Sequence, residues 1–189
     1  MHHHHFAYSE SERRSRQDPE AILNSLGLKP GMCFVDLGCN DGFFTLPAAK
    51  LVGSSGQVYA VDVDDTALSR LEIKLKNENI NNTHVIHGPA ETTDVCEGCA
   101  DIVFLGMVLH DFSDPLKALS NCSTMLSDSG IVYDYDWKKQ ASQFGPPYEI
   151  RFSKEYVKQL ASLANLKAIS ELDYDDDFYL IKLRSINGE

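Results

Sequence analysis

The sequence has no apolar run long enough to span a membrane and no excess of basic residues. None of its 189 residues belongs to a stretch approaching the ~20 apolar residues of a transmembrane helix, and no signal peptide opens the chain. Lys and Arg number 17 against 28 Asp and Glu, which gives a formal net charge of −11. Because such a surface repels a phosphate backbone, we expect no nucleic-acid partner. From the missing apolar span and signal peptide we expect a cytoplasmic protein without membrane insertion.

The sequence also lacks a regular cysteine framework. Five cysteines, an odd number without regular spacing, do not make the framework of a small disulfide-rich secreted protein. Cys96 and Cys99 form a lone C-x-x-C pattern with three interpretations: a surface disulfide, a binding site for a soft metal ion, or two unrelated loop cysteines. A zinc site needs two more ligands and the sequence has no second cysteine pair, so we expect no metal. The short basic cluster of Arg13, Arg14 and Arg16 fits a solvated helix end at least as well as a binding patch.

Apolar runs bounded by turn residues alternate with helical spacings along the chain. The expected strands are 33–37, 58–63, 85–87, 102–105, 131–133, 168–172 and 178–183. The expected helices are 41–51, 66–76, 115–125 and 153–164, after a first helix that starts at Asp18-Pro19 and closes at Gly27. This order predicts an α/β fold with a doubly wound, mostly parallel seven-stranded sheet. Because the turn 173–177 is too short for a crossover helix, the last two strands should form a terminal antiparallel hairpin.

One domain, 18–189, accounts for these elements. Residues 1–17 are expected to form an N-terminal segment that serves as a flexible arm or lid. His2 to His5 are either part of a purification tag or native, and no interpretation depends on them.

The loop after the first strand reads Asp36-Leu37-Gly38-Cys39-Asn40-Asp41-Gly42. In an open α/β sheet, ligands bind beyond the carboxyl ends of the strands, which is where this loop lies. The dinucleotide fingerprint G-x-G-x-x-G is absent, because Asn40 stands where its second glycine is required, and no Walker Lys follows. Because the loop contains Asp36 and Asp41 and no nearby cation, it is poorly suited to pyrophosphate. It suits a cationic ligand that also carries an amino group, such as a sulfonium.

Asp62 ends the second strand, twenty residues past Gly42. A carboxylate there can accept both hydroxyls of a ribose. Acids also end strands simply to cap the following turn, so Asp62 alone is weak evidence. Its spacing from the glycine loop favours a nucleoside site.

These motifs, with Asp101-Ile102-Val103-Phe104 leading into Leu109-His110-Asp111, resemble the class I S-adenosylmethionine-dependent methyltransferases. The likeness is greatest to the branch of the ubiquinone/menaquinone C-methyltransferases and runs from about residue 19 to 183. It implies a Rossmann-like methyltransferase fold, S-adenosyl-L-methionine as cofactor, S-adenosyl-L-homocysteine as product and a small-molecule methyl acceptor.

The resemblance also implies which residues hold the cofactor. They are Asp36, Gly38, Cys39, Asn40, Gly42, Phe43, Asp62, Val63, Pro89, Ala90, Glu91 and Gly106. Asn40 replaces the family's middle glycine, which the turn can survive because Asn tolerates left-handed dihedrals. Pro89 stands where an acid often accepts from the adenine amino group, so either Glu91 substitutes or that contact is lost.

His110, just past the fourth strand, is the candidate general base, with Asp111 beside it. The alternative is that His110 only caps a strand or helix through a hydrogen bond. Asp136, Trp137 and Tyr148 are the candidate substrate-side residues, in a segment expected beyond the fifth strand with its charged residues in water. Trp137 either walls an aromatic or cationic acceptor or packs in the core.

Little chain is left to cover the site, since only the segment before Asp18 and the stretch 138–148 are free to do so. That argues for a small acceptor, or for the exposed atom of a larger one. Two other functions stay open: a non-catalytic S-adenosylmethionine-binding scaffold and a nucleotide-dependent oxidoreductase. The acceptor and the oligomeric state are not predicted.

Overall fold

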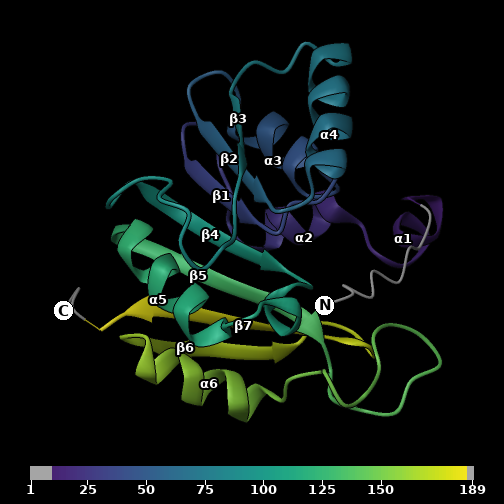
Figure 1. Ribbon diagram of the computed structural model, residues 1–189, viewed down its shortest axis with the longest axis vertical. Coiled ribbons are helices and arrows are strands. Elements are labelled where there is room, and N and C mark those ends of the chain that lie inside the picture. The colour runs from purple at the N-terminus through teal and green to yellow at the C-terminus, as the bar shows by residue number, and fades with distance from the viewer. Residues whose placement is uncertain (1–9, 187–189) are drawn as a thin grey trace.

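A twisted sheet runs through the computed structural model, which describes residues 10–186 (Figure 1). Across these residues the sheet has seven strands in the order β3-β2-β1-β4-β5-β7-β6. They are β1 Cys33–Leu37, β2 Gln57–Asp62, β3 Thr83–His87, β4 Ala100–Gly106, β5 Leu126–Trp137, β6 Leu166–Asp173 and β7 Phe178–Ser185. β1 to β5 are parallel, and β7 lies antiparallel between β5 and β6. The predicted doubly wound sheet and its terminal antiparallel hairpin are thus confirmed.

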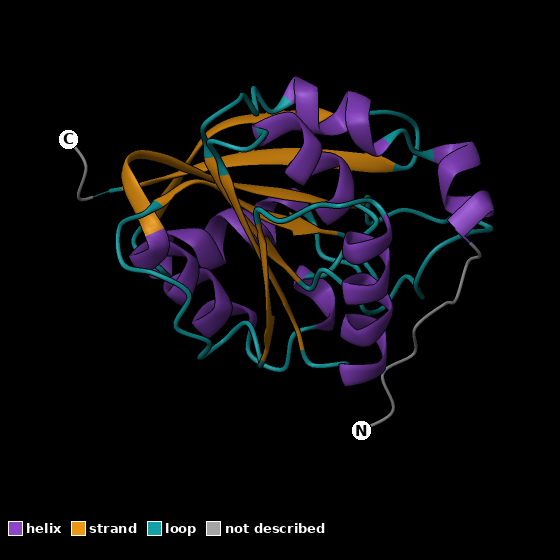
Figure 2. Cartoon of the chain, turned by 90° about the horizontal axis from the view of Figure 1, so that it is seen from above, coloured by secondary structure: helices purple, strands orange, loops and turns teal. Residues whose placement is uncertain are grey.

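Helices pack against both faces of the sheet (Figure 2). They are α2 Pro19–Ser25, α3 Thr45–Val52, α4 Asp65–Asn77, α5 Pro115–Met125 and α6 Lys154–Leu163. The first helix, α1 Glu10–Arg16, lies apart from these faces (Figure 1), and a 3-10 turn spans Leu109–Asp111. Successive strand residues point to opposite faces. Phe34 packs with α2 and α3, whereas its neighbour Val35 belongs to the cluster that includes α5 and α6. Both faces are apolar, which is why the strands read as continuous hydrophobic runs.

Side-chain caps fix where the helices begin. Asp18 accepts from the N–H groups of Glu20 and Ala21 at the start of α2, with Pro19 in the first turn. The helix expected over 41–51 begins only at Thr45. Pro47 therefore lies in the first turn, where its missing N–H breaks no helical hydrogen bond. A proline in the middle of the expected helix implies either a late helix start or a kink. The structure has the late start.

β5 is much longer than its sequence pattern predicts. It spans Leu126–Trp137 rather than 131–133, because it pairs with β4 on one side and with β7 on the other. The expectation that the charged residues here lie in water is wrong for Asp134 and Asp136, which are both buried, although Lys139 is exposed. Each has a polar partner that makes burial tolerable: Asp134 accepts from the Tyr179 hydroxyl at 2.9 Å, and Asp136 lies 2.7 Å from His110 Nδ1.

Cys96 and Cys99 are joined by a disulfide, which decides among the three interpretations of the C-x-x-C pattern. In the described part of the chain, no group of three or more His, Cys, Asp or Glu side chains is arranged to hold a metal ion. Within residues 10–186, no helix combines the length and the hydropathy of a membrane span. His2 to His5 and the start of the predicted lid lie outside the described residues.

Candidate active site

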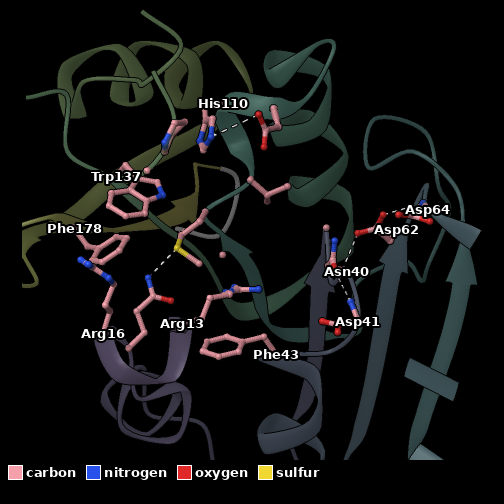
Figure 3. A pocket seen from close by; sticks show the side chains of 18 of the residues that line it. Arg13, Arg16, Asn40, Asp41, Phe43, Asp62, Asp64, His110, Trp137 and Phe178 are labelled. Carbon is pink, nitrogen blue, oxygen red and sulfur yellow. Dashed lines mark hydrogen bonds and ion pairs between the residues drawn. The ribbon is translucent and has the colours of Figure 1, made fainter. Parts of the chain in front are cut away.

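A pocket of about 390 Å³ opens at the carboxyl ends of β1, β2, β4 and β5 (Figure 3). Eight of the residues singled out in the sequence line it: Gly38, Asn40, Phe43, Asp62, Gly106, His110, Asp111 and Trp137. Asn40 and Asp62 gather at one end of the pocket, and Trp137 and Phe178 lie at the other. The sheet thus brings together side chains from distant parts of the sequence, such as Asn40 and Phe178.

Nine predicted site residues lie outside the lining of this pocket: Asp36, Cys39, Gly42, Val63, Pro89, Ala90, Glu91, Asp136 and Tyr148. Asp36 and Asp136 lie buried directly behind lining residues, and Ala90 is packed in the core. Val63 is exposed. The Glu91 carboxylate accepts from the Asp114 backbone N–H, and Tyr148 is exposed with the Lys139 ammonium 5.0 Å from its ring centre.

The loop after β1 wraps over the end of β2. Gly38 has φ +79° and Asn40 has φ +47°, so the Asn does take the left-handed conformation expected of it. The backbone N–H groups of Gly38 and Cys39 both donate to the Val61 carbonyl. A Cβ on Gly38 would lie 2.4 Å from Val108 Cγ2, so the loop depends on a glycine at this position.

Asp62 holds this loop and still has room for a ligand. One carboxylate oxygen accepts from the Asn40 N–H at 2.7 Å and the other from the Asp64 N–H at 2.9 Å. Each oxygen has two lone pairs, so one acceptor position on each remains for a ribose hydroxyl. Asp62 therefore caps the turn and can also bind a ribose.

Asp36 lies beneath the loop with 2% of its surface exposed and accepts from the Thr45 hydroxyl at 2.6 Å. Burial, together with the charge of Asp62 and against the opposing effects of the Thr45 hydrogen bond and Arg13, raises the pKa of Asp36 to about 7. A cation bound above the loop would favour its ionised form.

His110 is clamped between carboxylates. Its Nδ1 lies 2.7 Å from Asp136 Oδ2 and its Nε2 lies 3.6 Å from Asp111 Oδ1. Burial by itself lowers the pKa of His110, but the charge and hydrogen bond of Asp136, with Asp111 and Asp134 nearby, raise it to about 9. The imidazole is therefore protonated on both nitrogens, and positively charged, at neutral pH.

The segment expected to form a lid contributes side chains to the pocket, but no sequence pattern identifies which of its residues line it. Arg13 and Arg16 of α1 line it, with Arg13 4.0 Å from the Phe43 ring centre. Gln17 donates to the Met107 sulfur at 2.9 Å, while its buried Oε1 finds no hydrogen-bond partner among the described residues. The arginine cluster was the one available signal, and it also fitted a solvated helix end. No local signal points to Gln17, Met107 or Phe178.

The chain is similar in sequence to known methyltransferases. A family model described as a methyltransferase domain matches residues 35–133, just over half of the chain. A demethylmenaquinone methyltransferase of Staphylococcus aureus (strain MRSA252) is 30% identical over 112 residues, which cover 59% of this chain and 45% of the relative. The ubiquinone/menaquinone biosynthesis C-methyltransferase UbiE of Marinomonas sp. (strain MWYL1) is 27% identical over 122 residues, 64% of this chain and 49% of that protein. The matched region thus spans about half the length of these curated relatives.

Solved structures share the fold. An S-adenosylmethionine-dependent methyltransferase from Aquifex aeolicus superposes with a TM-score of 0.82 at 24% identity, covering 94% of this chain and 98% of that one. The [4+2]-cyclase SpnF superposes with a TM-score of 0.78 at 12% identity, covering 96% of this chain and 83% of that one. The chain belongs to the class I S-adenosylmethionine-dependent methyltransferase family.

Proposed function

We propose that the protein transfers the methyl group of S-adenosylmethionine to a small-molecule acceptor. The observation that carries this proposal is the pairing of Asp62 with the glycine loop at the carboxyl ends of β1 and β2. The alternative of a nucleotide-dependent oxidoreductase is not favoured, because the loop lacks both a glycine fingerprint and a lysine for phosphates.

The residues present fit the cofactor. Asp62 would hold the ribose through its two remaining acceptor positions, and the exposed Val63 next to it would pack on the adenine. The unpartnered Oε1 of Gln17 is suited to accept from the ammonium of the methionine part, and the loop of Gly38 and Asn40 would wrap that part. When bound, the cofactor supplies an electrophilic methyl group on a sulfonium.

The chain's own task is then to position the acceptor. Alignment of donor and acceptor can supply about 7–11 kcal/mol of the barrier. Trp137, Phe178 and Met107 form apolar walls at the acceptor end of the pocket. The names of the curated relatives point to quinone-type acceptors, and these walls suit a small ring of that kind.

His110 would bind an oxygen atom of the acceptor. Because Asp136 and its neighbours keep the imidazole protonated at neutral pH, His110 donates a hydrogen bond and stabilises negative charge as it develops on that oxygen. The role of general base, expected from the sequence, is then confined to pH values above about 9. Asp111 and Asp136 act through His110 by holding its ring.

We further propose that α1, with Arg13 and Arg16, and the stretch 138–148 form the cover of the site. Arg16 lies 3.6 Å from the Phe144 ring centre, so the two parts of the cover touch each other. A cover this small leaves room for a small acceptor. The cytoplasmic location expected from the sequence stays a prediction.

Isothermal titration calorimetry with S-adenosylhomocysteine and NAD tests the cofactor assignment, and tighter binding of NAD would contradict it. A screen of small quinols and phenols with methyl-labelled S-adenosylmethionine tests the activity. Tight cofactor binding without turnover on any acceptor would favour the scaffold function instead.

A further inference from the structure

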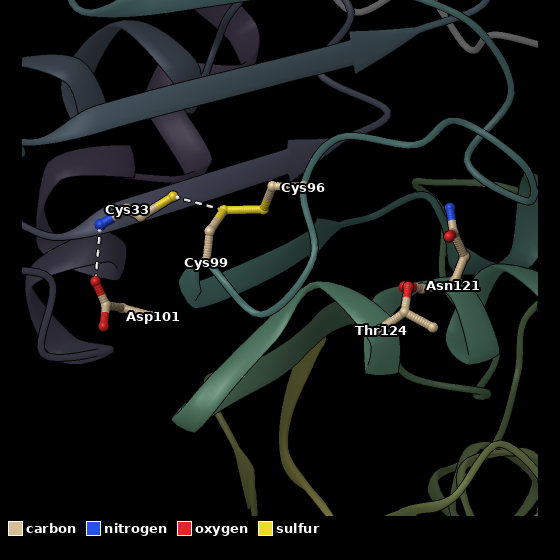
Figure 4. Close-up of a disulfide and its surroundings, with 6 residues drawn as sticks. All are labelled: Cys33, Cys96, Cys99, Asp101, Asn121 and Thr124. Carbon is tan, nitrogen blue, oxygen red and sulfur yellow. Dashed lines mark hydrogen bonds between the residues drawn. A yellow bond between two sulfur atoms is a disulfide. The ribbon is translucent and has the colours of Figure 1, made fainter.

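Three cysteine sulfurs lie close together at the end of the sheet opposite the pocket. Cys96 and Cys99 form the disulfide, and the Sγ of Cys33 lies 3.4 Å from the Sγ of Cys99 (Figure 4). Cys33 is the first residue of β1 and Cys99 directly precedes β4, which pairs with β1. The cluster therefore lies at the amino ends of these strands, whereas the pocket lies at their carboxyl ends.

Hydrogen bonds hold the segments that carry the three sulfurs. The Cys33 N–H donates to Asp101 Oδ2 at 2.8 Å, and the Gly98 N–H donates to the Thr124 carbonyl at 3.1 Å. The Asn121 amide, on α5, donates to the carbonyls of Ala90 and Thr93 in the same loop. Because the Cys99 sulfur carries no hydrogen in a disulfide, Cys33 is the donor in the sulfur–sulfur contact. The thiol is thus held against the disulfide by both strands and by α5.

The disulfide has the properties of an exchangeable bond rather than of a structural cross-link. Its cysteines are three residues apart, so it closes a very short loop and constrains the unfolded chain little. Cys33, Cys96 and Cys99 are all only partly buried, within reach of a small reagent. Partly exposed disulfides are the labile ones, and C-x-x-C is a spacing used for thiol–disulfide exchange.

We propose that Cys33, Cys96 and Cys99 form a thiol–disulfide exchange site for low-molecular-weight thiols and disulfides. In the internal step, the Cys33 sulfur loses its proton and attacks Cys99. The Cys96–Cys99 bond breaks as the Cys33–Cys99 bond forms, and Cys96 leaves as a thiolate that takes up the proton. In the external step, two molecules of a thiol such as glutathione give two electrons and two protons to the disulfide and become glutathione disulfide.

Burial and the Asp101 carboxylate raise the pKa of Cys33 to about 11. Cys33 is therefore a protonated thiol near pH 7, and its attack on the disulfide should become faster as the pH rises. The loop that carries this disulfide starts at Gly88, directly after β3, and includes Pro89 and Glu91. Exchange at Cys96 and Cys99 thus acts on one end of this loop. The family resemblance places the other end, at Pro89 and Glu91, beside the adenine.

The variant Cys96→Ser tests the third sulfur. Incubated with glutathione disulfide, this variant should form a Cys33–Cys99 disulfide, detected by alkylation of free thiols and peptide mass spectrometry. The double variant Cys96→Ser/Cys33→Ser is the matched control, in which Cys99 should instead carry glutathione. If Cys99 of the folded single variant stays reduced or carries only glutathione, the proposal is overturned. Circular dichroism on both variants establishes that they are folded.

A titration of the unaltered protein tests the exchange itself. In glutathione buffers of increasing reducing strength, the number of free cysteines should rise reversibly from three to five, with Cys96 and Cys99 gaining the label together. The variant Cys122→Ala, which removes a buried cysteine outside the cluster, should show the same transition with one fewer label. A disulfide that resists reduction in the folded protein, or that does not re-form, would also overturn the proposal.

Discussion

The imidazole of His110 is joined to the carboxylate of Asp136 by a contact of 2.7 Å across the neighbouring ends of β4 and β5. Asp136 is fixed in turn, because its second oxygen accepts from the Trp137 N–H at 2.7 Å. Asp136 thereby controls the protonation state of His110, and two predictions depend on this pair.

The first prediction concerns the charge of His110. In Asp136→Asn, the main group that raises the pKa of His110 is neutralised, so its titration midpoint should fall from about 9 toward or below the ordinary 6.5. A histidine whose folded pKa is raised stabilises the fold fully below about pH 6.5 and loses that contribution as pH rises through 9. NMR titration of the His110 ring gives the midpoint, and thermal unfolding at pH 6 and pH 9.5 should show a smaller difference in the variant. An unchanged midpoint would show that Asp136 does not control the proton.

The second prediction separates a hydrogen-bond donor from a base at His110. If the protonated ring holds an acceptor oxygen, His110→Asn should retain most of the turnover, because an amide N–H can still donate. His110→Ala should lose roughly tenfold or more, the usual effect of losing a hydrogen bond to a charged group. Initial rates between pH 6 and 8 provide the measurement once an acceptor is known. A loss of about 10²–10⁴-fold in His110→Asn would instead indicate proton transfer.

The third prediction concerns Asp62. Asp62→Ala removes two acceptor positions for the ribose and the anchor of Asn40, so affinity for S-adenosylhomocysteine should fall at least about tenfold. Asp65→Ala is the control, since this neighbouring acid has an exposed side chain. Calorimetry on both variants, with circular dichroism to establish folding, measures the difference. Equal affinities in the two variants would show that the ribose is held elsewhere.

The fourth prediction compares two glycines with nearly the same backbone angle. Gly38 has φ +79° and Gly27 has φ +84°, but a Cβ on Gly38 would meet Val108 at 2.4 Å, whereas one on Gly27 would meet nothing within 4 Å. Gly27→Ala should therefore cost only the left-handed strain, about 1–2 kcal/mol of unfolding free energy. Gly38→Ala should cost more and also weaken cofactor binding, since Val108 and the loop must shift. Urea unfolding of both variants supplies the comparison, and equal losses would contradict the clash.

The sequence was informative where structure is set by neighbours in the chain. α5 begins at Pro115 as expected, because Asp114 caps it and the proline fits its first turn. Asn40 adopts the predicted left-handed turn for a similarly local reason. The sequence patterns could not predict which strands pair when the strands are far apart in the chain. β5 continues to Trp137 because it pairs with β7, which lies some forty residues further along the chain.

The same limit applies to the sites. Asp134 and Asp136 read as solvated charges, since nothing near them in the sequence announces Tyr179 and His110 as partners. The approach of Cys33 to Cys99 depends on β1 and β4 being neighbours, although 66 residues separate the two cysteines. Predicting these contacts requires the strand order itself.

β5 lies between β4 and β7, with backbone hydrogen bonds along both of its edges, and this has a consequence for hydrogen exchange. Amides of paired central strands exchange with solvent mainly through global unfolding, so those on the pocket's floor, near Tyr135 and Trp137, should be among the slowest in the molecule. α1 is a helix of seven residues, and the stretch 138–148 contains neither helix nor strand, so amides in the cover should exchange rapidly. Ligand binding should therefore slow exchange in the cover as well as in the loop after β1, and the exchange rates of the cover amides report on its closure.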